Sequence, residues 1–385
     1  MLKFKKYNNY YFYHNNNMKK NTNILKFNLC LTIFFIISIL SIYSAKTISL
    51  DGLGNIFVKQ VIYYILGLGI LLISYYYKKE IIKYAFLWYW GFNFLLFILL
   101  FLGVSINGSR CWLILGPFSF QPSEFMKISL ILVLANILNK YNSKKDIKTE
   151  FKMLTKIIII FLIPVILTFL EPDTGVVIIY FIIMISMILY RGINKKWYYF
   201  IIITLTILIS IILYLYFFKN ELLLNILGKN IFYRIERILN WSNGSGYQLE
   251  NSLITIGSSG ILGFGFNNIP LYYPEASTDF VFTSFSSSFG FIGNIFLLIT
   301  IIIFDSSILS LCTNKVKRID KYLLIGIFSM ITYQQIQNIS MTIGLLPITG
   351  ITLPYISYGG SSLFSYMFIL GILLRIAKDE KIFLN

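Results

Sequence analysis

The stretch Asp279–Phe304, DFVFTSFSSSFGFIGNIFLLITIIIF, decides the fold class, because a single carboxylate precedes an uncharged run that continues to Phe304. A helix needs about 20 apolar residues to cross the hydrocarbon core of a bilayer, and this run is long enough. Comparable runs recur from Phe27 to Ile376, and 57% of the 385 residues are hydrophobic. The sequence therefore predicts one all-α polytopic membrane protein.

Ten transmembrane helices are expected, with boundaries defined to within a few residues. Their predicted ranges are Phe27–Ala45, Val58–Tyr77, Ala85–Ile106, Pro122–Leu138, Ile157–Leu170, Gly175–Tyr190, Trp197–Phe218, Asp279–Phe304, Tyr322–Leu345 and Tyr355–Ala377. Most of the 33 Lys and Arg residues lie in connections on one side of these helices. Because positive residues are retained in the cytoplasm, both termini are predicted to be cytoplasmic.

Polar segments flank and interrupt the predicted membrane domain, which spans residues 27–377. Residues 1–26 are rich in Asn, Tyr and Lys and predict a disordered cytoplasmic tail, and residues 378–385 predict a second short tail. Residues 219–278 predict a large extracytoplasmic loop between helices 7 and 8. A loop of this length is usually functional or contains helices of its own.

Composition excludes several classes of function. The net charge of +17 is distributed between apolar runs, which indicates membrane topology and not a nucleic-acid partner. The single histidine, His14, lies in the tail, so neither a Ser-His-Asp triad nor a His-ligated metal is available. Acid–base chemistry must therefore be carried out by carboxylates. No cofactor is required by the sequence, although a divalent cation would be compatible with it.

Asp279 is the favoured catalytic residue, because it connects the long loop directly to an apolar helix. A carboxylate at this position also suits a simpler role, since it would cap the helix and stabilise its dipole. Glu275 lies just upstream, and Arg234 and Arg237 lie earlier in the same loop. This association of a carboxylate with cations under a long loop favours catalysis.

A second polar segment opens the predicted fourth helix, where Glu124 and Lys127 are three residues apart. This spacing places them on one helix face within ion-pairing reach. Two interpretations remain open: a structural salt bridge, or a lysine that acts as an electrophile in a polar cavity. Arg110 and Trp112 precede this segment on the predicted exterior side.

Three further exterior segments are rich in glycine and proline. Leu170–Gly175 predicts a tight turn between two short spans, with a role in the chemistry as the less favoured alternative. Gly244–Gly265 contains Tyr247 and Gln248, and its glycines predict a loop that folds closely over a substrate. Gly344–Ser362 predicts irregular backbone that lines a cavity at membrane depth.

In order and spacing, these segments resemble the SEDS family of bacterial cell-wall synthases, which includes RodA, FtsW and SpoVE, with a slight leaning to RodA. The matching segments are Asn107–Lys127 (GxxRW and QPSE with Lys), Leu170–Gly175 (QPD-G), Gly246–Gly265 (GYQ and IGSGG), Pro274–Phe280 (PE and TDF) and Gly344–Ser362 (GLLP-TG-LP-SYGGSS). The resemblance covers the chain from about Phe27 to Ala377.

The resemblance implies a peptidoglycan glycosyltransferase in the bacterial cytoplasmic membrane, which polymerises lipid II at the outer face. It also implies a class B penicillin-binding protein as partner. Because an α-linked donor gives a β-1,4 product, the reaction inverts and needs a general base, which is expected to be Asp279. Arg110, Lys127, Arg234 and Arg237 are expected to hold the pyrophosphate. The other expected substrate contacts are Trp112, Glu124, Tyr247, Gln248, Glu275, Ser357, Gly359 and Gly360.

The chain departs from the family pattern at two places. Ser286–Ser288 stand where the family commonly has acids, and Glu171 stands where it usually has Gln. Two other functions remain open: a lipid II flippase, in which polar groups line a translocation path, and a scaffold without catalysis. A flippase predicts comparable polar groups on the inner side, and a scaffold predicts that Asp279 tolerates substitution.

Overall fold

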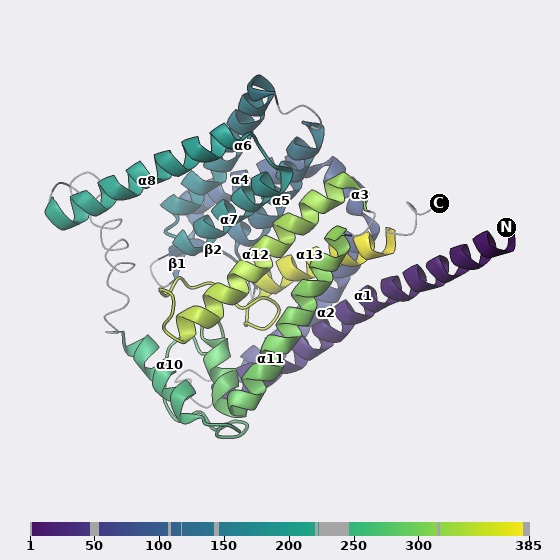
Figure 1. Cartoon of the computed structure of the whole chain (residues 1–385). Helices are drawn as coiled ribbons and strands as arrows, with labels where there is room; N and C mark the ends of the chain where they lie inside the picture. The colour runs from purple at the N-terminus through teal and green to yellow at the C-terminus, as the bar shows by residue number, and fades with distance from the viewer. Residues whose placement is uncertain are drawn as a thin grey trace.

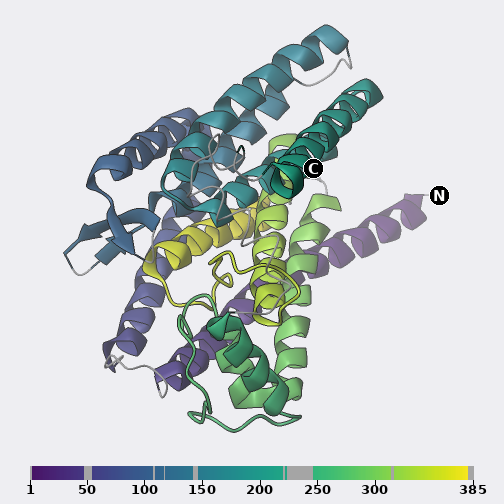
Figure 2. The same cartoon turned by 90° about the vertical axis from the view of Figure 1, so that its left-hand side faces the viewer.

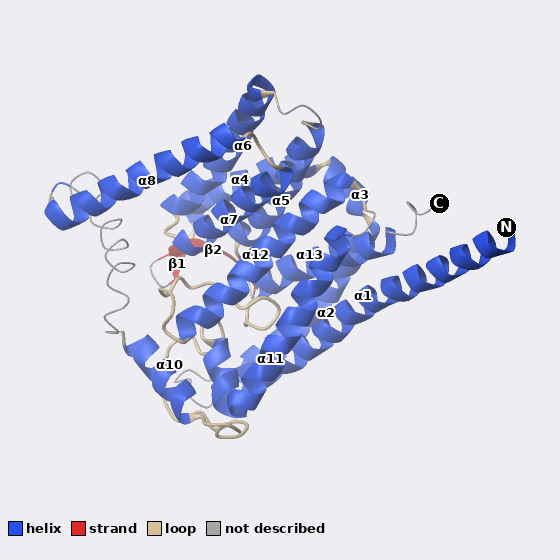
Figure 3. Ribbon diagram, in the orientation of Figure 1, coloured by secondary structure: helices blue, strands red, loops and turns tan. Residues whose placement is uncertain are grey.

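The computed structural model describes residues 2–46, 54–106, 109–116, 118–141, 146–219, 222, 246–313 and 316–379 (Figure 1). The long helices are α1 (Leu2–Ala45), α2 (Gly54–Tyr76), α4 (Ala85–Leu102), α5 (Pro122–Lys140), α6 (Ile147–Leu170), α7 (Thr174–Arg191), α8 (Lys195–Phe218), α11 (Val281–Thr313), α12 (Arg318–Thr342) and α13 (Gly360–Asp379). The shorter helices are α3 (Lys78–Lys83) and α10 (Tyr247–Ser258). Helices dominate the described chain (Figure 3).

Each of the ten predicted spans overlaps one of these long helices. Within the described residues, eight helices are long and apolar enough to cross a membrane: α1, α2, α4, α5, α6, α7, α11 and α13. The prediction of an all-α polytopic membrane protein is therefore confirmed. α8 and α12 are outside these eight, and α8 lies at the edge of the bundle (Figure 1). α12 carries buried amides such as Gln334 and Asn338, so its polar face is turned into the protein.

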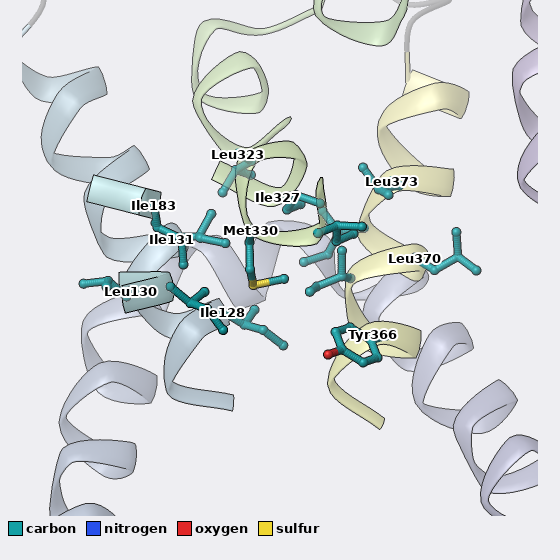
Figure 4. Packing of buried hydrophobic residues seen from close by; sticks show 14 of the residues in the cluster. Ile128, Leu130, Ile131, Ile183, Leu323, Ile327, Met330, Tyr366, Leu370 and Leu373 are labelled. Atoms are coloured by element: carbon teal, nitrogen blue, oxygen red, sulfur yellow. The ribbon is translucent and has the colours of Figure 1, made fainter. Parts of the chain in front are cut away.

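The most enclosed helices, α5, α12 and α13, form the centre of the bundle. In α5 and α13, 83% of the membrane-length window is buried, against 28% in α2. Side chains from α5, α7, α12 and α13 meet there, including Ile131, Ile183, Met330 and Leu370 (Figure 4). Gly326 of α12 has no space for a Cβ beside Ile131, and this close approach is typical of packed membrane helices.

The helix predicted at Ala85–Ile106 ends earlier, because α4 stops at Leu102. A Cβ at Gly103 would collide with the carbonyl oxygens of Leu99 and Arg110, so the glycine allows the chain to turn closely against the next segment. A small antiparallel sheet follows, formed by β1 (Val104–Ile106), β2 (Ser109–Leu115) and β3 (Phe118–Phe120).

The amino-terminal segment before Phe27 is part of α1, and its place in a cytoplasmic tail stays a prediction. α1 is one continuous helix from Leu2 to Ala45 and projects away from the bundle (Figure 1). The physical reason is that the apolar part of α1 supplies a formed helix, and extending a helix costs much less than starting one. The segment before Phe27 contains neither Gly nor Pro to stop that extension.

The span predicted at Asp279–Phe304 is broken at Gly290, which has φ +61° and non-helical geometry inside α11. The break separates a short helix, Val281–Phe289, from the long part of α11 that ends at Thr313. The short helix, called here the half-helix, is buried from Val281 to Ser288. Asp279 therefore opens a buried half-helix and not the membrane-crossing segment itself.

The glycines of the long loop explain this break. Gly263 and Gly290 approach each other so closely that neither has room for a Cβ, and Phe264 N–H donates to the carbonyl of Ser287 (2.8 Å). Phe291 N–H donates to the carbonyl of Gly260 (3.0 Å). Loop and helix thus exchange backbone hydrogen bonds at the point where the helix cannot satisfy its own. In this part of the loop, the glycines allow the backbone to pack directly against α11.

The helices carry charged clusters at both of their ends. The end at which α5, α7 and α13 begin contains Asp279 and is called the site end. At the opposite end, Lys78 pairs with Asp320 (2.9 Å) and with Asp379 (3.5 Å), which joins the starts of α3 and α12 to the end of α13. Arg375 also pairs with Asp379 (3.0 Å). This group is called the clamp.

Candidate functional site

Asp279 lies in a tight turn immediately before the half-helix, and its side chain is partly buried. Asn338 of α12 fixes this turn, because its amide donates to the carbonyls of Asp279 (2.8 Å) and Ile351 (2.7 Å). A Cβ at Gly350 would lie 3.4 Å from Oδ2 of Asp279. The carboxylate therefore faces the backbone of the connection between α12 and α13.

The surroundings of Asp279 favour its neutral form. The pKa of Asp279 is raised to about 7, mainly by burial and also by the negative charges of Glu275 and Asp173. Among the described residues, no Lys or Arg forms an ion pair with Asp279. A carboxylate with a pKa near neutrality is suited to accept a proton at physiological pH.

Asp173 is the second carboxylate of the site. It caps α7 by accepting from Val176 N–H (3.2 Å), and its other oxygen accepts from the amide of Gln121 (3.1 Å). Burial raises the pKa of Asp173, and the charge of Glu124 raises it further, whereas Lys127 and the hydrogen bonds lower it. The turn predicted at Leu170–Gly175 is present. Asp173 of this turn also contacts Gln121, so the turn contributes a carboxylate to the site.

Four helix starts meet around these carboxylates. Gln121, just before α5, donates its N–H to Ser361 Oγ at the start of α13 (3.0 Å) and its side chain to Asp173 before α7. A Cβ at Gly175 of α7 would collide with the carbonyl of Thr349, beside Asp279 and the half-helix. Each helix start carries a partial positive charge, so their convergence creates a field that attracts anions.

The predicted ion pair between Glu124 and Lys127 is formed. Lys127 is fully buried and donates to both carboxylate oxygens of Glu124 (2.9 and 2.8 Å). Ser365 of α13 also donates to Glu124 (3.3 Å), and the Lys127 ammonium lies 5.7 Å from the ring centre of Tyr366. The pair thus joins α5 to α13, and the charges of both residues act on the pKa of Asp173.

The Gly344–Ser362 segment supports the Asp279 turn through backbone contacts. Ser357 Oγ donates to the carbonyl of Thr278 (2.6 Å), and Tyr358 N–H donates to the carbonyl of Ser277 (2.9 Å). Gly359 N–H reaches the side chain of Gln60 (3.5 Å). Gly360 packs on the ring of Tyr63, where a Cβ would approach to 3.2 Å. Ser357 therefore holds the Asp279 turn, whereas Gly359 and Gly360 join this segment to α2.

Residues of the long loop lie beside the same turn. Gln248 of α10 donates to the carbonyl of Pro274 (3.0 Å), which fixes the approach to Asp279. Glu275 is exposed, has φ +57° and accepts a hydrogen bond from Thr278 Oγ1. Tyr247 is exposed at the start of α10. Of these three predicted residues, Glu275 raises the pKa of Asp279 through its charge, and Gln248 holds the segment that leads to Asp279.

Two further predicted residues, Arg110 and Trp112, lie on the small sheet. Arg110 is exposed on β2, and its backbone N–H donates to the carbonyl of Glu171 (3.2 Å). Trp112, also on β2, pairs with Val104 of the neighbouring strand. Arg234 and Arg237 lie outside the residues that the structure describes.

Four residues near the site were not among the predicted site residues: Asp173, Gln121, Asn338 and Glu171. Glu171 is fully buried, and neither of its carboxylate oxygens has a hydrogen-bond partner among the described residues. Burial raises the pKa of Glu171 to about 9, and the charge of Asp173 contributes to the rise. The sequence did contain signals for these residues. Glu171 and Asp173 flank Pro172, and Asn338 is an amide inside an apolar helix.

The described residues contain no group of three or more His, Cys, Asp or Glu side chains placed to hold a metal ion. The compatibility with a divalent cation stays a prediction. The chemistry that the described site supports directly is proton transfer to a carboxylate, close to helix starts that attract an anion.

Comparison with known proteins agrees with this arrangement. A family model for FtsW, RodA and SpoVE, described as "Cell cycle protein", matches residues 24–382. A probable peptidoglycan glycosyltransferase FtsW of Wigglesworthia glossinidia brevipalpis is 38% identical over 73% of this chain and 73% of its own length. The FtsW of Coxiella burnetii is 34% identical over 84% of this chain and 87% of its own. The stage V sporulation protein E of Bacillus subtilis is 31% identical over 75% and 77%.

Two solved structures share the fold. A chain from a structure described as "Structural coordination of polymerization and crosslinking by a peptidoglycan synthase complex" has a TM-score of 0.74 at 23% identity, covering 93% of this chain and 97% of that chain. The rod shape determining protein RodA of Thermus thermophilus has a TM-score of 0.64 at 24% identity, covering 92% and 96%. At these identities the likeness concerns the fold alone.

Proposed function

The chain belongs to the FtsW/RodA/SpoVE family of cell cycle proteins, and from that premise we propose that it is a peptidoglycan glycosyltransferase. It polymerises lipid II into β-1,4 glycan strands at the outer face of the bacterial cytoplasmic membrane. The sequence relatives reported above are FtsW and SpoVE proteins, so their names do not favour the RodA subgroup. We assign the chain to cell-wall synthesis during division or elongation.

The proposed topology has ten spans, with α8 and α12 added to the eight apolar helices and both termini in the cytoplasm. The long loop between α8 and α11 then lies outside, together with Asp279 and the site end. The polar face of α12 is turned inward, which allows a helix with buried amides to cross the bilayer.

In the proposed mechanism, Asp279 acts as the general base. It accepts the proton of the acceptor sugar's 4-hydroxyl, and the oxygen attacks the anomeric carbon of the donor. The bond from that carbon to the pyrophosphate oxygen breaks, and undecaprenyl pyrophosphate leaves with the electron pair. The observation that carries this proposal is a carboxylate with a pKa of about 7 and no paired cation among the described residues.

The leaving pyrophosphate is negatively charged and needs stabilisation in the transition state. The converging starts of α5, α7, α13 and the half-helix supply a fixed positive field, and Lys127 lies nearby in its ion pair with Glu124. Arg110, Trp112, Tyr247 and the two loop arginines, Arg234 and Arg237, remain proposed contacts for other parts of the substrate. Glu171 stays in its neutral form here, so it adds no negative charge to this field.

We further propose a class B penicillin-binding protein as partner, which would supply the transpeptidase. The structural neighbour described as a peptidoglycan synthase complex supports this proposal by its fold. Such a partner would use the glycan strands as they leave the site end.

The test is polymerisation of lipid II by the purified chain, co-expressed with its partner and assayed in the presence of moenomycin. The chain should produce glycan strands, whereas Asp279→Asn should fold, bind the partner and produce none. Asp146→Asn, at an exposed position away from the site, is the matched control and should polymerise normally. Lipid II transport without polymerisation would favour the flippase, and normal activity of Asp279→Asn would refute the mechanism.

A further inference from the structure

The loop that follows α10 carries an unusually apolar tip, Gly260–Phe266. Gly260, Gly263 and Gly265 all have positive φ angles, which produce a tight turn that presents the residues between them. Ile261 and Leu262 are 67% and 76% exposed. No charged residue occurs from Asn251 to Pro274. An exposed, uncharged apolar tip of this kind needs a non-aqueous environment.

The tip continues the lipid-facing surface of α11. Ile292 N–H donates to the carbonyl of Ile261 (3.2 Å), and Ile292 is itself exposed on a helix apolar enough to cross the membrane. Further exposed apolar residues follow along that helix, including Ile295, Ile299 and Ile302. Figures 1 and 3 show the tip beside the first turn of the long part of α11.

Aromatic residues mark the same level of the molecule. Phe266 stacks on Tyr43 at the end of the α1 span, with ring centres 5.4 Å apart, and Tyr43 also contacts Phe57 near the start of α2 (5.7 Å). Aromatic side chains collect where the bilayer core meets its headgroups. The tip is therefore at the level where these spans leave the hydrocarbon core.

We propose that Ile261 and Leu262 insert into the outer leaflet, so that Gly260–Phe266 anchors the exterior loop in the membrane. The occupant of the tip surface is lipid acyl chain, because the tip is continuous with a surface that already faces lipid. The loop thus contacts the bilayer, although its glycines suggested a cover over the substrate.

The anchor has a consequence for Asp279 that rests on the proposed function. Figure 2 shows α10 and the start of α11 at one end of the bundle. Phe264 N–H holds the carbonyl of Ser287, and Gly263 packs directly on Gly290, so the tip and the half-helix move together. Because Asp279 begins the half-helix, insertion of the tip sets the depth of the carboxylate relative to the bilayer. A lipid-linked substrate presents its sugar at a depth fixed by the same bilayer.

Spin labelling in nanodiscs tests the insertion without any assay of activity. A nitroxide is attached to Leu262→Cys in a chain whose native Cys30, Cys111 and Cys312 are replaced by serine or alanine. The label should be relaxed by oxygen and protected from nickel-EDDA, which stays in water. A label on Glu250→Cys, at an exposed position of α10, should show the opposite preference.

Two outcomes would overturn the proposal. Equal accessibility of both labels to nickel-EDDA would place the tip in water, and protection of the Leu262 label from both relaxants would place it under protein. The functional consequence is tested by Leu262→Asn, which should lower polymerisation about tenfold and expose the Ile261 position to nickel-EDDA. Asp279→Asn should leave the tip inserted, so failure of the proposed function and failure of the anchor give different results.

Discussion

The two ends of the bundle differ in how their carboxylates are paired. At the site end Glu124 pairs with Lys127, but three neighbouring carboxylates form no ion pair among the described residues. In the clamp, Asp320 and Asp379 pair with Lys78, and Asp379 also pairs with Arg375. At the site end, Asp279, Asp173 and Glu171 have no ion pair among the described residues, and the pKa of each is raised by burial. The same helices, α12 and α13, run from one environment to the other.

This difference separates structural charge from reactive charge. Paired carboxylates stay ionised and hold helices in place, because each charge is neutralised by its partner. Unpaired carboxylates in a buried site have a raised pKa, and a carboxylate whose pKa lies near the working pH can be deprotonated and still accept a proton efficiently. The same difference bears on the flippase alternative, which predicts polar groups free to bind substrate on the inner side. The clamp does contain charged residues, but they pair with one another.

The largest expected effect on stability comes from the ion pair between Glu124 and Lys127 at the site end. Lys127→Met leaves Glu124 buried and unpaired, so the free energy of unfolding should fall by about 3–5 kcal/mol. Denaturation in detergent measures this loss. The double variant Glu124→Gln/Lys127→Met should recover most of the stability but remain inactive. A double variant with the normal polymerisation rate would show that the pair is only structural.

A change in the clamp should have the opposite profile. Asp320→Asn removes the closest partner of Lys78, but Asp379 remains at 3.5 Å, so the expected loss of stability is about 1–3 kcal/mol. The polymerisation rate per folded molecule should stay unchanged. If the folded variant polymerised lipid II much more slowly, the two ends would be coupled. The clamp would then not be purely structural.

Glu171→Gln should raise stability at high pH. In the folded chain the pKa of Glu171 is about 9, against an ordinary value of 4.5. The folded state therefore binds more protons than the unfolded state between these values, and stability falls as pH rises through that window. The variant removes this penalty, so its advantage should grow from pH 5 to pH 9, by at most about 1.4 kcal/mol per pH unit. An advantage independent of pH would contradict an uncharged Glu171.

The smallest effect is expected at the edge of the site. Gln248→Ala removes one hydrogen bond to the carbonyl of Pro274, worth about 1 kcal/mol. Polymerisation should slow by less than about tenfold, since the Asp279 turn keeps its bonds from Asn338 and Ser357. Loss of all activity in a folded variant would place Gln248 on the substrate itself.

The sequence predicted the membrane class and the helices well, because apolar length alone decides them. The pair Glu124–Lys127 was also predictable, since three residues of one helix define its geometry. The break at Gly290 was not, because it depends on contact with Gly263 across the loop. Asp173 and Asn338 were missed for a related reason: their roles arise only where separate helices meet.

The pH dependence of lipid II polymerisation, compared between the chain and Asp279→Asn, tests the central claim most directly. The account predicts a rate that rises with pH around a midpoint near 7, as Asp279 loses its proton. It predicts that the variant is about 10²–10⁴-fold slower and lacks this rise. A variant with the same rate and the same pH profile as the unmodified chain would contradict the account.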